Sequence, residues 1–324
     1  MLLRTDVGHY AYSKRGRGDI NMKEEIGHVI LNYEFYQGSD QYSDGDIEDE
    51  LLEYVKNTVD VYEILKKDNR WPILYHLSPV RQNILEWYDF KKDSKVLEIG
   101  AGCGAITGVL CKKAGKVVCN DLSKRRSQIN AYRNKEFDNL EIIVGNFNDI
   151  VIEEKFDYIT LIGVLEYAAY YTDSQTPFKS FLEHIKKLLK PDGKVLIAIE
   201  NKFGLKYWGG AKEDHTGMMF DGIEGYHQTT SKARTFSKEQ LQEIIKSAGF
   251  EEQEFFYPFP DYKFPQQIFS GKYMPKSQDL ICAVESFDNS RFHLFDETSA
   301  FVELVEADKF DFFANSFFVE AGLR

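Results

Sequence analysis

The sequence predicts an α/β fold with a doubly wound, mainly parallel sheet. Three observations support this prediction. Strands alternate with helices from about residue 75 onward, a glycine-rich loop joins the first of these strands to the next helix, and the run at Phe156–Gly163 is apolar almost throughout. An apolar strand of this kind is typical of a sheet buried on both faces. Repeated strand–helix units also indicate right-handed crossovers, with helices on both sides of the sheet.

Hydrophobic periodicity and turn residues place the individual elements. A helix that begins at Ser78 leads into the alternation. The predicted strands are Lys95–Ile99, Lys116–Asp121, Leu140–Val144, Phe156–Gly163, Lys194–Glu200, Glu251–Tyr257 and Phe312–Glu320. The predicted helices are Ala105–Lys113, Lys124–Asn134, Pro177–Lys190, and one that starts at a capping box of Ser237 and Gln240 and ends before Gly249.

The chain is expected to divide into an N-terminal α+β extension or cap, residues 1–74, and a main domain, residues 75–324. The extension holds a strand at Ile26–Tyr36 and a helix at Ile47–Lys67, whose first turn carries acids that complement the helix dipole. Two stretches of the main domain are too long for ordinary connections and are therefore expected to be functional insertions, at about 201–235 and 259–311.

The charge balance bears on the partners. The chain has 40 Lys and Arg against 52 Asp and Glu, a formal net charge of −12. A negative field repels phosphate backbones, so no nucleic-acid partner is expected. The short basic run Lys124–Arg126 is explained as the solvated face of a helix.

Cysteine usage and hydropathy bear on the compartment. Cys103, Cys111, Cys119 and Cys282 have neither metal-ligand spacing nor the pattern of a disulfide framework, so reduced thiols are expected. The first eighteen residues lack the apolar stretch of a signal peptide, and no apolar run reaches membrane-spanning length. A cytoplasmic protein without a transmembrane segment is therefore expected.

The segment VLEIGAGCGAITG, residues 96–108, is the candidate ligand-binding loop. Gly100, Gly102 and Gly104 alternate between a strand and a helix, which allows a tight turn and the close approach of a ligand to unpaired helix N–H groups. On spacing alone this loop could hold a dinucleotide, because Asp121 lies near the distance expected for a ribose-binding acid. A nicotinamide-dependent oxidoreductase is therefore one alternative.

Glu98 separates the two interpretations of this loop. It lies two residues before Gly100, where a carboxylate would repel a pyrophosphate but suits a cationic amino-acid group. S-adenosylmethionine carries an ammonium and a sulfonium and no phosphate. The sign of the charge thus favours this methyl donor.

With these motifs in order, residues 75–324 resemble the class I S-adenosylmethionine-dependent methyltransferases. The resemblance implies a Rossmann-like sheet of seven strands, the last antiparallel, and S-adenosylhomocysteine as product. It implies that the glycine loop holds the methionine part, that Asp121 takes the ribose hydroxyls, that Asn146 lies beside the adenine, and that IGVLEY, residues 162–167, lies under the donor. The expected cofactor-binding residues are Arg81, Glu98, Gly100, Ala101, Gly102, Cys103, Gly104, Asp121, Leu122, Asn146, Phe147, Gly163, Glu166 and Tyr167.

A narrower resemblance concerns IENKFGLKYWGGAKEDHTGMMFDGIEGY and the following ARTFSKEQL. These runs resemble methyltransferase domains of bacterial surface-polysaccharide assembly enzymes, several of which are joined to glycosyl- or phosphotransferase domains. The resemblance implies a glycan or sugar-linked acceptor and association with glycosyltransferases. A non-catalytic scaffold with the same fold is the alternative from another class, but the intact loop and acids argue against it.

The first insertion leaves the carboxyl end of the fifth strand, so it is expected to overhang the donor's methyl group. A hydroxyl acceptor needs a base, for which His215 is the first candidate, His227 the second and Asp214 the third. No metal site is predicted, because Asp214, His215 and Asp221 have no recognised ligand spacing. The aromatic run at 255–265 is expected to pack on the core rather than stack on sugars.

Overall fold

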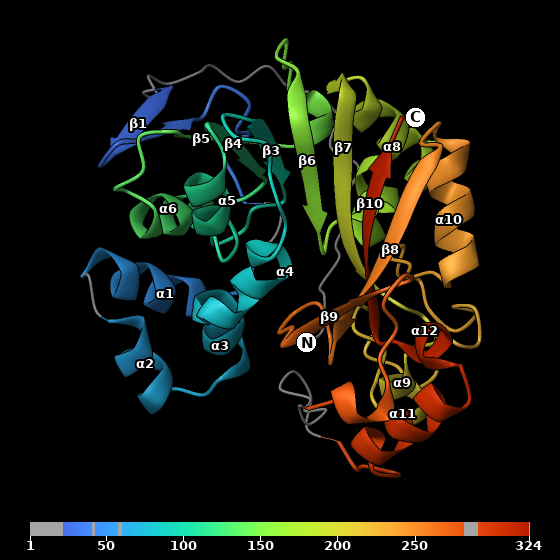
Figure 1. The fold of residues 1–324 in the computed structure, drawn as a ribbon. Helices are drawn as coiled ribbons and strands as arrows, with labels where there is room; N and C mark the ends of the chain where they lie inside the picture. The colour runs from blue at the N-terminus through green and yellow to red at the C-terminus, as the bar shows by residue number, and fades with distance from the viewer. Residues whose placement is uncertain (1–21, 41–42, 58–59, 282–290, 324) are drawn as a thin grey trace.

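The computed structural model describes residues 22–40, 43–57, 60–281 and 291–323. Its strands are β1 (Lys23–Ile26), β2 (Val29–Asn32), β3 (Lys95–Ile99), β4 (Lys116–Asp121), β5 (Leu140–Val144), β6 (Phe156–Ile162), β7 (Leu189–Glu200), β8 (Glu252–Phe259), β9 (Gln267–Ser270) and β10 (Ser316–Gly322). They form one sheet in the order β1-β2-β5-β4-β3-β6-β7-β10-β8-β9 (Figure 1).

The centre of this sheet confirms the predicted fold class. Strands β5, β4, β3, β6 and β7 pair in parallel, and β10 lies antiparallel between β7 and β8. The sheet has more strands than the seven expected, because the extension adds β1 and β2 at one edge and the second insertion adds β9 at the other. Strand β2 pairs in parallel with β5.

Helices cover both faces of the sheet (Figure 1). They are α1 (Ile47–Lys56), α2 (Val61–Lys67), α3 (Trp71–Leu77), α4 (Asn83–Glu86), α5 (Thr107–Lys113), α6 (Lys124–Arg133), α7 (Ala168–Tyr171), α8 (Pro177–Lys186), α9 (Leu205–Trp208), α10 (Lys238–Ser247), α11 (Glu297–Glu306) and α12 (Phe310–Phe313). No helix in the described ranges is both long and apolar enough to cross a membrane.

The alternation of side chains along β7 explains the two hydrophobic cores. Val195, Ile197 and Ile199 point to one face and pack in a cluster with residues of α8 and α10. Leu196 and Ala198 point to the other face, in a cluster with residues of α4, α5 and α6. All five are buried, so this strand is apolar on both faces, as its sequence predicts.

The extension differs from its prediction in two places. The stretch expected as one strand at Ile26–Tyr36 is the second half of a hairpin, because Gly27 turns the chain with φ 62° and Ile26 pairs with Val29. The helix expected at Ile47–Lys67 is two helices, α1 and α2, and the side chain of Asp60 caps the second by accepting a hydrogen bond from the backbone N–H of Tyr62.

Several boundaries in the main domain also differ. Helix α5 begins at Thr107 rather than Ala105, α8 ends at Lys186 rather than Lys190, and β8 ends at Phe259 rather than Tyr257. Strand β7 begins at Leu189 rather than Lys194, because the turn residues 191–193 form a bulge: Phe156 pairs with Leu189, and the next paired residue, Tyr158, pairs with Lys194. Strand β10 begins at Ser316, because the aromatic residues before it form α12, where Phe310 is buried against other rings. The capping box at Ser237 is confirmed.

The thiols agree with their prediction where they are described. Cys103, Cys111 and Cys119 are buried free thiols that form no disulfide. Cys282 and the start of the chain, on which the signal-peptide prediction depends, lie outside the described residues.

Candidate functional site

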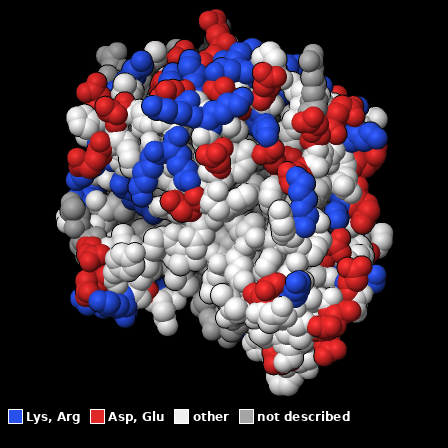
Figure 2. All heavy atoms as spheres, in the orientation of Figure 1, with Lys and Arg blue, Asp and Glu red and all other residues white. Residues whose placement is uncertain are grey.

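A pocket of about 310 Å³ lies at the carboxyl ends of β3, β4, β6 and β7, the edge at which α/β folds bind ligands. In Figure 1 this edge faces downward, with α1, α2 and α3 on one side and α9, α11 and α12 on the other. Figure 2, in the same orientation, shows mostly uncharged surface across the lower centre of this face, between two flanks that carry charged side chains. The pocket is lined by the glycine loop, by α3 of the extension and by both insertions.

The glycine loop supplies one wall of the pocket, and its glycines have different functions. Gly100, Gly102 and Gly104 all have positive φ, at 70°, 53° and 72°. At Gly102 an added Cβ would meet nothing nearer than the guanidinium of Arg126 at 3.7 Å, so the backbone there is open to a ligand. Gly104 does not line the pocket, since a Cβ there would lie 2.2 Å from Oδ1 of Asn130 in α6.

The two predicted acids lie at the ends of β3 and β4 and line the pocket. Glu98 is buried and accepts hydrogen bonds from Thr107 Oγ1 at 2.6 Å and Cys119 Sγ at 3.1 Å, and burial raises its pKa to about 7. Asp121 accepts from the backbone N–H groups of Gly102 at 2.8 Å and Ser123 at 2.9 Å. Burial also raises the pKa of Asp121. This acid therefore ties the glycine loop to β4 while facing the pocket.

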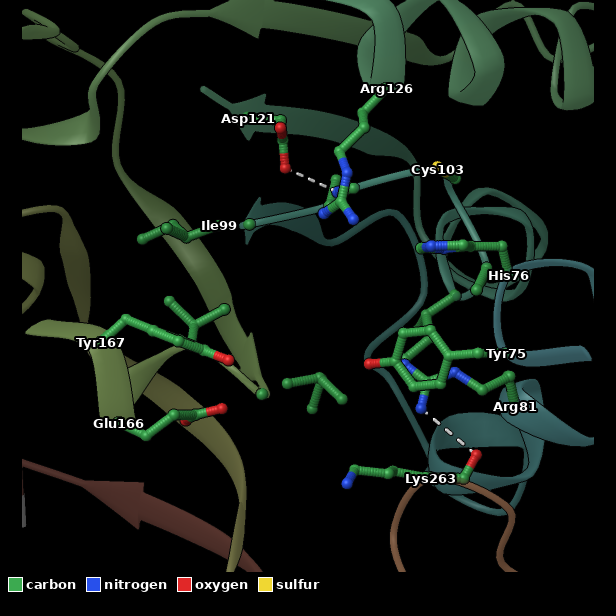
Figure 3. A pocket seen from close by; sticks show the side chains of 18 of the residues that line it. Tyr75, His76, Arg81, Ile99, Cys103, Asp121, Arg126, Glu166, Tyr167 and Lys263 are labelled. Carbon is green, nitrogen blue, oxygen red and sulfur yellow. Dashed lines mark hydrogen bonds between the residues drawn. The ribbon is translucent and has the colours of Figure 1, made fainter. Parts of the chain in front are cut away.

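Arg81 also lines the pocket, as predicted, and is held there by its neighbours. Its Nη2 donates to the Tyr75 hydroxyl at 3.1 Å, its Nη1 donates to the Lys263 carbonyl at 3.3 Å, and its guanidinium lies 4.0 Å from the centre of the Tyr75 ring (Figure 3). Its Nε is buried without a hydrogen-bond partner. A donor group thus remains for an anionic ligand.

Arg126 corrects the interpretation of the basic run. It was expected on a solvated helix face, but it is buried and lies between Asp121 and Cys103 in the pocket wall (Figure 3). Its Nε donates to the carboxylate of Glu48 at 2.8 Å, and Nη2 contacts Asp44. Glu48 is one of the first-turn acids that were expected to complement the dipole of α1. It is fully buried and forms an ion pair with Arg126.

His215 lies at the far end of the pocket among carboxylates. Its Nδ1 is 3.1 Å from Glu213 Oε1, and its Nε2 is 3.7 Å from Glu166 Oε1 and 3.9 Å from Glu200 Oε2. Burial acts to lower the pKa of this imidazole, but the carboxylates outweigh it and hold the pKa well above its usual range. Both nitrogens face acids, an arrangement that disfavours the general-base role predicted for this residue.

The other two candidates for the base differ in position. Asp214 lines the pocket and forms ion pairs with Lys206, at 3.1 Å, and with Lys263 Nζ. Burial acts to raise the pKa of this carboxyl, but the two lysines outweigh it and hold the pKa well below its usual range. His227 is exposed and is not among the residues that line the pocket. The insertion nevertheless reaches the pocket through Asp214 and His215, and its place over the donor's methyl group stays a prediction.

Among the remaining predicted cofactor residues, Ala101, Cys103, Leu122, Gly163, Glu166 and Tyr167 line the pocket. Asn146 and Phe147 do not. Asn146 caps a turn by accepting from the backbone N–H of Asn148 at 3.0 Å, and the Phe147 ring packs on Phe181. Their adenine contact therefore stays a prediction.

Sequence reasoning missed several pocket residues besides Arg126, among them Trp71, Glu200 and Lys263. For Glu200 a signal existed, since it is an acid at the carboxyl end of an apolar strand. Trp71 and Lys263 come from an extension and an insertion whose path the sequence does not reveal. In the aromatic run, Phe255, Tyr257 and Phe259 are buried in the core, which confirms the packing prediction.

His76 in α3 should make the fold sensitive to acid. This side chain is buried beside Arg81 and Arg126, its Nε2 bonds to Asp44 at 2.9 Å, and burial lowers its pKa to about 4. The unfolded chain takes up a proton near pH 6.5 but the folded chain does not, so the stabilisation is complete above pH 6.5 and is lost as the pH falls to 4. The expected loss is up to about 3 kcal/mol.

Urea unfolding of the parent and of His76→Gln at pH 7, 5.5 and 4.5 measures this effect. The free energy of unfolding should fall more steeply with acid in the parent than in the variant, which has no imidazole to protonate. Parallel curves for the two proteins would contradict the assignment.

Part of the chain is similar in sequence to known proteins. The model of a family described as "Methyltransferase domain" matches residues 97–195. A mitochondrial ubiquinone biosynthesis O-methyltransferase of Dictyostelium discoideum is 29% identical over 35% of this chain and 37% of its own length. A malonyl-[acyl-carrier protein] O-methyltransferase of Priestia megaterium is 31% identical over 34% of this chain and 38% of its own length.

A solved structure of a Haloferax volcanii methyltransferase in complex with its Trm112 activator is 17% identical, with a TM-score of 0.48, over 86% of this chain and 97% of that chain. The chain spans less than two fifths of the two curated relatives. The matched segment contains β3, the glycine loop, Asp121 and Glu166, all of which contribute to the lining of the pocket. Residues 97–195 of this chain are therefore similar to a methyltransferase domain.

Proposed function

We propose that this chain transfers a methyl group from S-adenosylmethionine to a hydroxyl of a sugar or sugar-linked acceptor. The observation that supports this most is the joining of two unlike halves in one pocket. One half is the glycine loop with Asp121 and Arg81, and the other is a group of buried carboxylates around His215.

The donor half fits S-adenosylmethionine. The open backbone at Gly102 accommodates a close ligand, the carboxylate of Asp121 can accept from ribose hydroxyls, and the unpartnered Nε of Arg81 can donate to the ligand's carboxylate. When bound, the cofactor supplies an electrophilic methyl group. The chain's own residues orient it, and α3 forms one wall of the pocket through Trp71 and Tyr75.

The acceptor half is polar and aromatic. Glu166 and Glu200 each present a carboxylate to this end of the pocket, and carboxylates suit an acceptor that carries hydroxyl groups. The rings of Trp71, Tyr75 and Tyr167 line the same pocket and offer flat surfaces to a sugar ring. The resemblance of residues 199–226 and 233–241 to polysaccharide-assembly methyltransferases also favours a glycan acceptor, and association with glycosyltransferases is part of the same proposal.

Donor binding is tested by calorimetry with S-adenosylmethionine, S-adenosylhomocysteine and NAD on the same preparation. We expect heat from the first two and none from NAD. Tight binding of NAD alone would favour the oxidoreductase instead. Radiolabelled methyl transfer to nucleotide-activated sugars, and not to amines of similar size, tests the acceptor, and labelling of the amines alone would contradict it.

Asp121→Ala should weaken the binding of S-adenosylhomocysteine by about 10- to 150-fold, since hydrogen bonds to a charged group contribute about 1.5–3 kcal/mol. Asp138→Ala, which removes an exposed acid from the loop before β5, is the matched control and should bind like the parent. Circular dichroism checks that Asp121→Ala is folded. An unchanged dissociation constant in a folded Asp121→Ala would show that this acid does not hold the ribose.

A further inference from the structure

We propose that Glu166, Glu200 and His215 bind a divalent cation of the first transition row, such as Mn²⁺ or Zn²⁺, at the acceptor end of the pocket. The sequence predicted no metal site, and the residues considered for one, Asp214, His215 and Asp221, share only His215 with this group. The arrangement of these three side chains supports the metal site, whereas the use of the ion in catalysis rests on the proposed function.

The distances suit one shared ion. One ligand atom from each residue lies within 4.8 Å of the other two. Nε2 of His215 is 3.7 Å from Glu166 Oε1 and 3.9 Å from Glu200 Oε2, beyond hydrogen-bond reach. Ligands about 2.0–2.2 Å from a tetrahedral ion lie about 3.4 Å from each other. The two separations between the imidazole and the carboxylates are thus within a few tenths of an ångström of that spacing.

The carboxylates themselves indicate a missing partner. Oε2 of Glu166 and Oε2 of Glu200 are buried without a hydrogen-bond partner, and each residue is only 1% exposed. Buried carboxylate oxygens without donors are costly unless they are paired or coordinate a metal. Lys263 Nζ contacts the other oxygen of Glu200 at 3.1 Å, which leaves Oε2 for the ion. Figure 3 shows Glu166 and Lys263 projecting into the pocket from opposite sides.

The imidazole is held in the orientation that a ligand needs. Glu213 lies 3.1 Å from Nδ1 of His215 and also accepts from the backbone N–H groups of His215 and Thr216 and from the Tyr226 hydroxyl. The carboxylate is thereby fixed, and Nε2 is turned toward Glu166 and Glu200. A carboxylate behind a histidine whose other nitrogen faces an ion is the usual arrangement of a metal-ligating histidine.

The ligand types select the ion and suggest its use. One imidazole with two carboxylates suits Mn²⁺, Fe²⁺, Co²⁺ or Zn²⁺, whereas Mg²⁺ prefers oxygen ligands alone. The two carboxylates balance the charge of the ion. A hydroxyl of the acceptor bound to it would have a lowered pKa and would release its proton to solvent water, so no side chain need serve as base.

The test is direct binding to the full chain after treatment with EDTA. We expect one Mn²⁺ or Zn²⁺ per chain by calorimetry, with the bound Mn²⁺ signal visible by electron paramagnetic resonance. Glu200→Gln and His215→Gln should each weaken binding by about 100-fold or more, because removing a ligand costs at least as much as losing its supporting residue.

Matched controls are Glu25→Gln and His28→Gln, both exposed in the β1–β2 hairpin, which should bind the ion like the parent. Thermal unfolding checks each variant, and Glu166→Gln replaces any that does not fold. A parent chain that binds no ion, or equal weakening in the controls, would overturn the proposal. Calorimetry with S-adenosylhomocysteine on the same samples separates this outcome from failure of the proposed function, since donor binding needs no ion.

Discussion

Replacing Arg126 with alanine should lower the free energy of unfolding by about 3–5 kcal/mol, the cost of leaving one charge of a buried pair without its partner. The charge left without its partner is the carboxylate of Glu48, which is fully buried and accepts a hydrogen bond from Nε of Arg126 at 2.8 Å. The pair joins α1 of the extension to α6 of the main domain. Urea unfolding at pH 7 measures the loss.

Arg125→Ala is the matched control. Arg125 precedes Arg126 and pairs at 3.2 Å with Asp49, but both side chains are more than a third exposed. Its removal should cost less than about 1 kcal/mol. Adding Glu48→Gln to Arg126→Ala should recover part of the loss, because an amide replaces the buried charge. Equal effects of the two arginine substitutions would contradict the structure.

Gly104→Ala should destabilise the chain by about 2–5 kcal/mol, from the left-handed backbone and overpacking together. A methyl group there would lie 2.2 Å from Oδ1 and 3.0 Å from Cα of Asn130. The Asn130 amide cannot easily move, because it donates to Thr107 Oγ1 at 3.0 Å and accepts from Asn134 Nδ2 at 2.8 Å. The midpoint of thermal unfolding should fall accordingly.

Gly102→Ala separates the effect of backbone strain from the effect of overpacking. Gly102 has a similar φ to Gly104, but a methyl group added there would meet nothing nearer than 3.7 Å and would project into the pocket. This variant should lose about 1–2 kcal/mol of stability and should bind S-adenosylhomocysteine more weakly than Gly104→Ala does in its folded state. Equal stability of the two variants would show that Gly104 does not pack against α6.

Much of the fold could be predicted from the sequence because the signals are local. The apolar runs of β3, β4, β5 and β6 match their predicted bounds to within one residue. Boundaries failed where tertiary contacts override a local pattern. The turn 191–193 is absorbed as a bulge in β7, and the aromatic residues before β10 form a helix because Phe310 packs against Phe301.

The donor side of the site was also predictable, since a strand, a glycine loop and an acid at the end of the next strand are adjacent in sequence and in space. Glu98, Gly102 and Asp121 all line the pocket. The acceptor side was predicted less well. His215 was recognised, but its chemical state depends on Glu166 and Glu200, which lie 49 and 15 residues before it in the chain.

Local sequence patterns are sufficient to predict the central strands, the glycine loop and the acids beside it, because hydrophobic period and turn chemistry act over a few residues. Which charges are buried, and which groups face them, depends on the folded structure. The folded structure places Arg126 against Glu48 and surrounds His215 with carboxylates from separate segments. Burial and electrostatic interaction depend on distances through space, and residues far apart along the chain set those distances only when it folds.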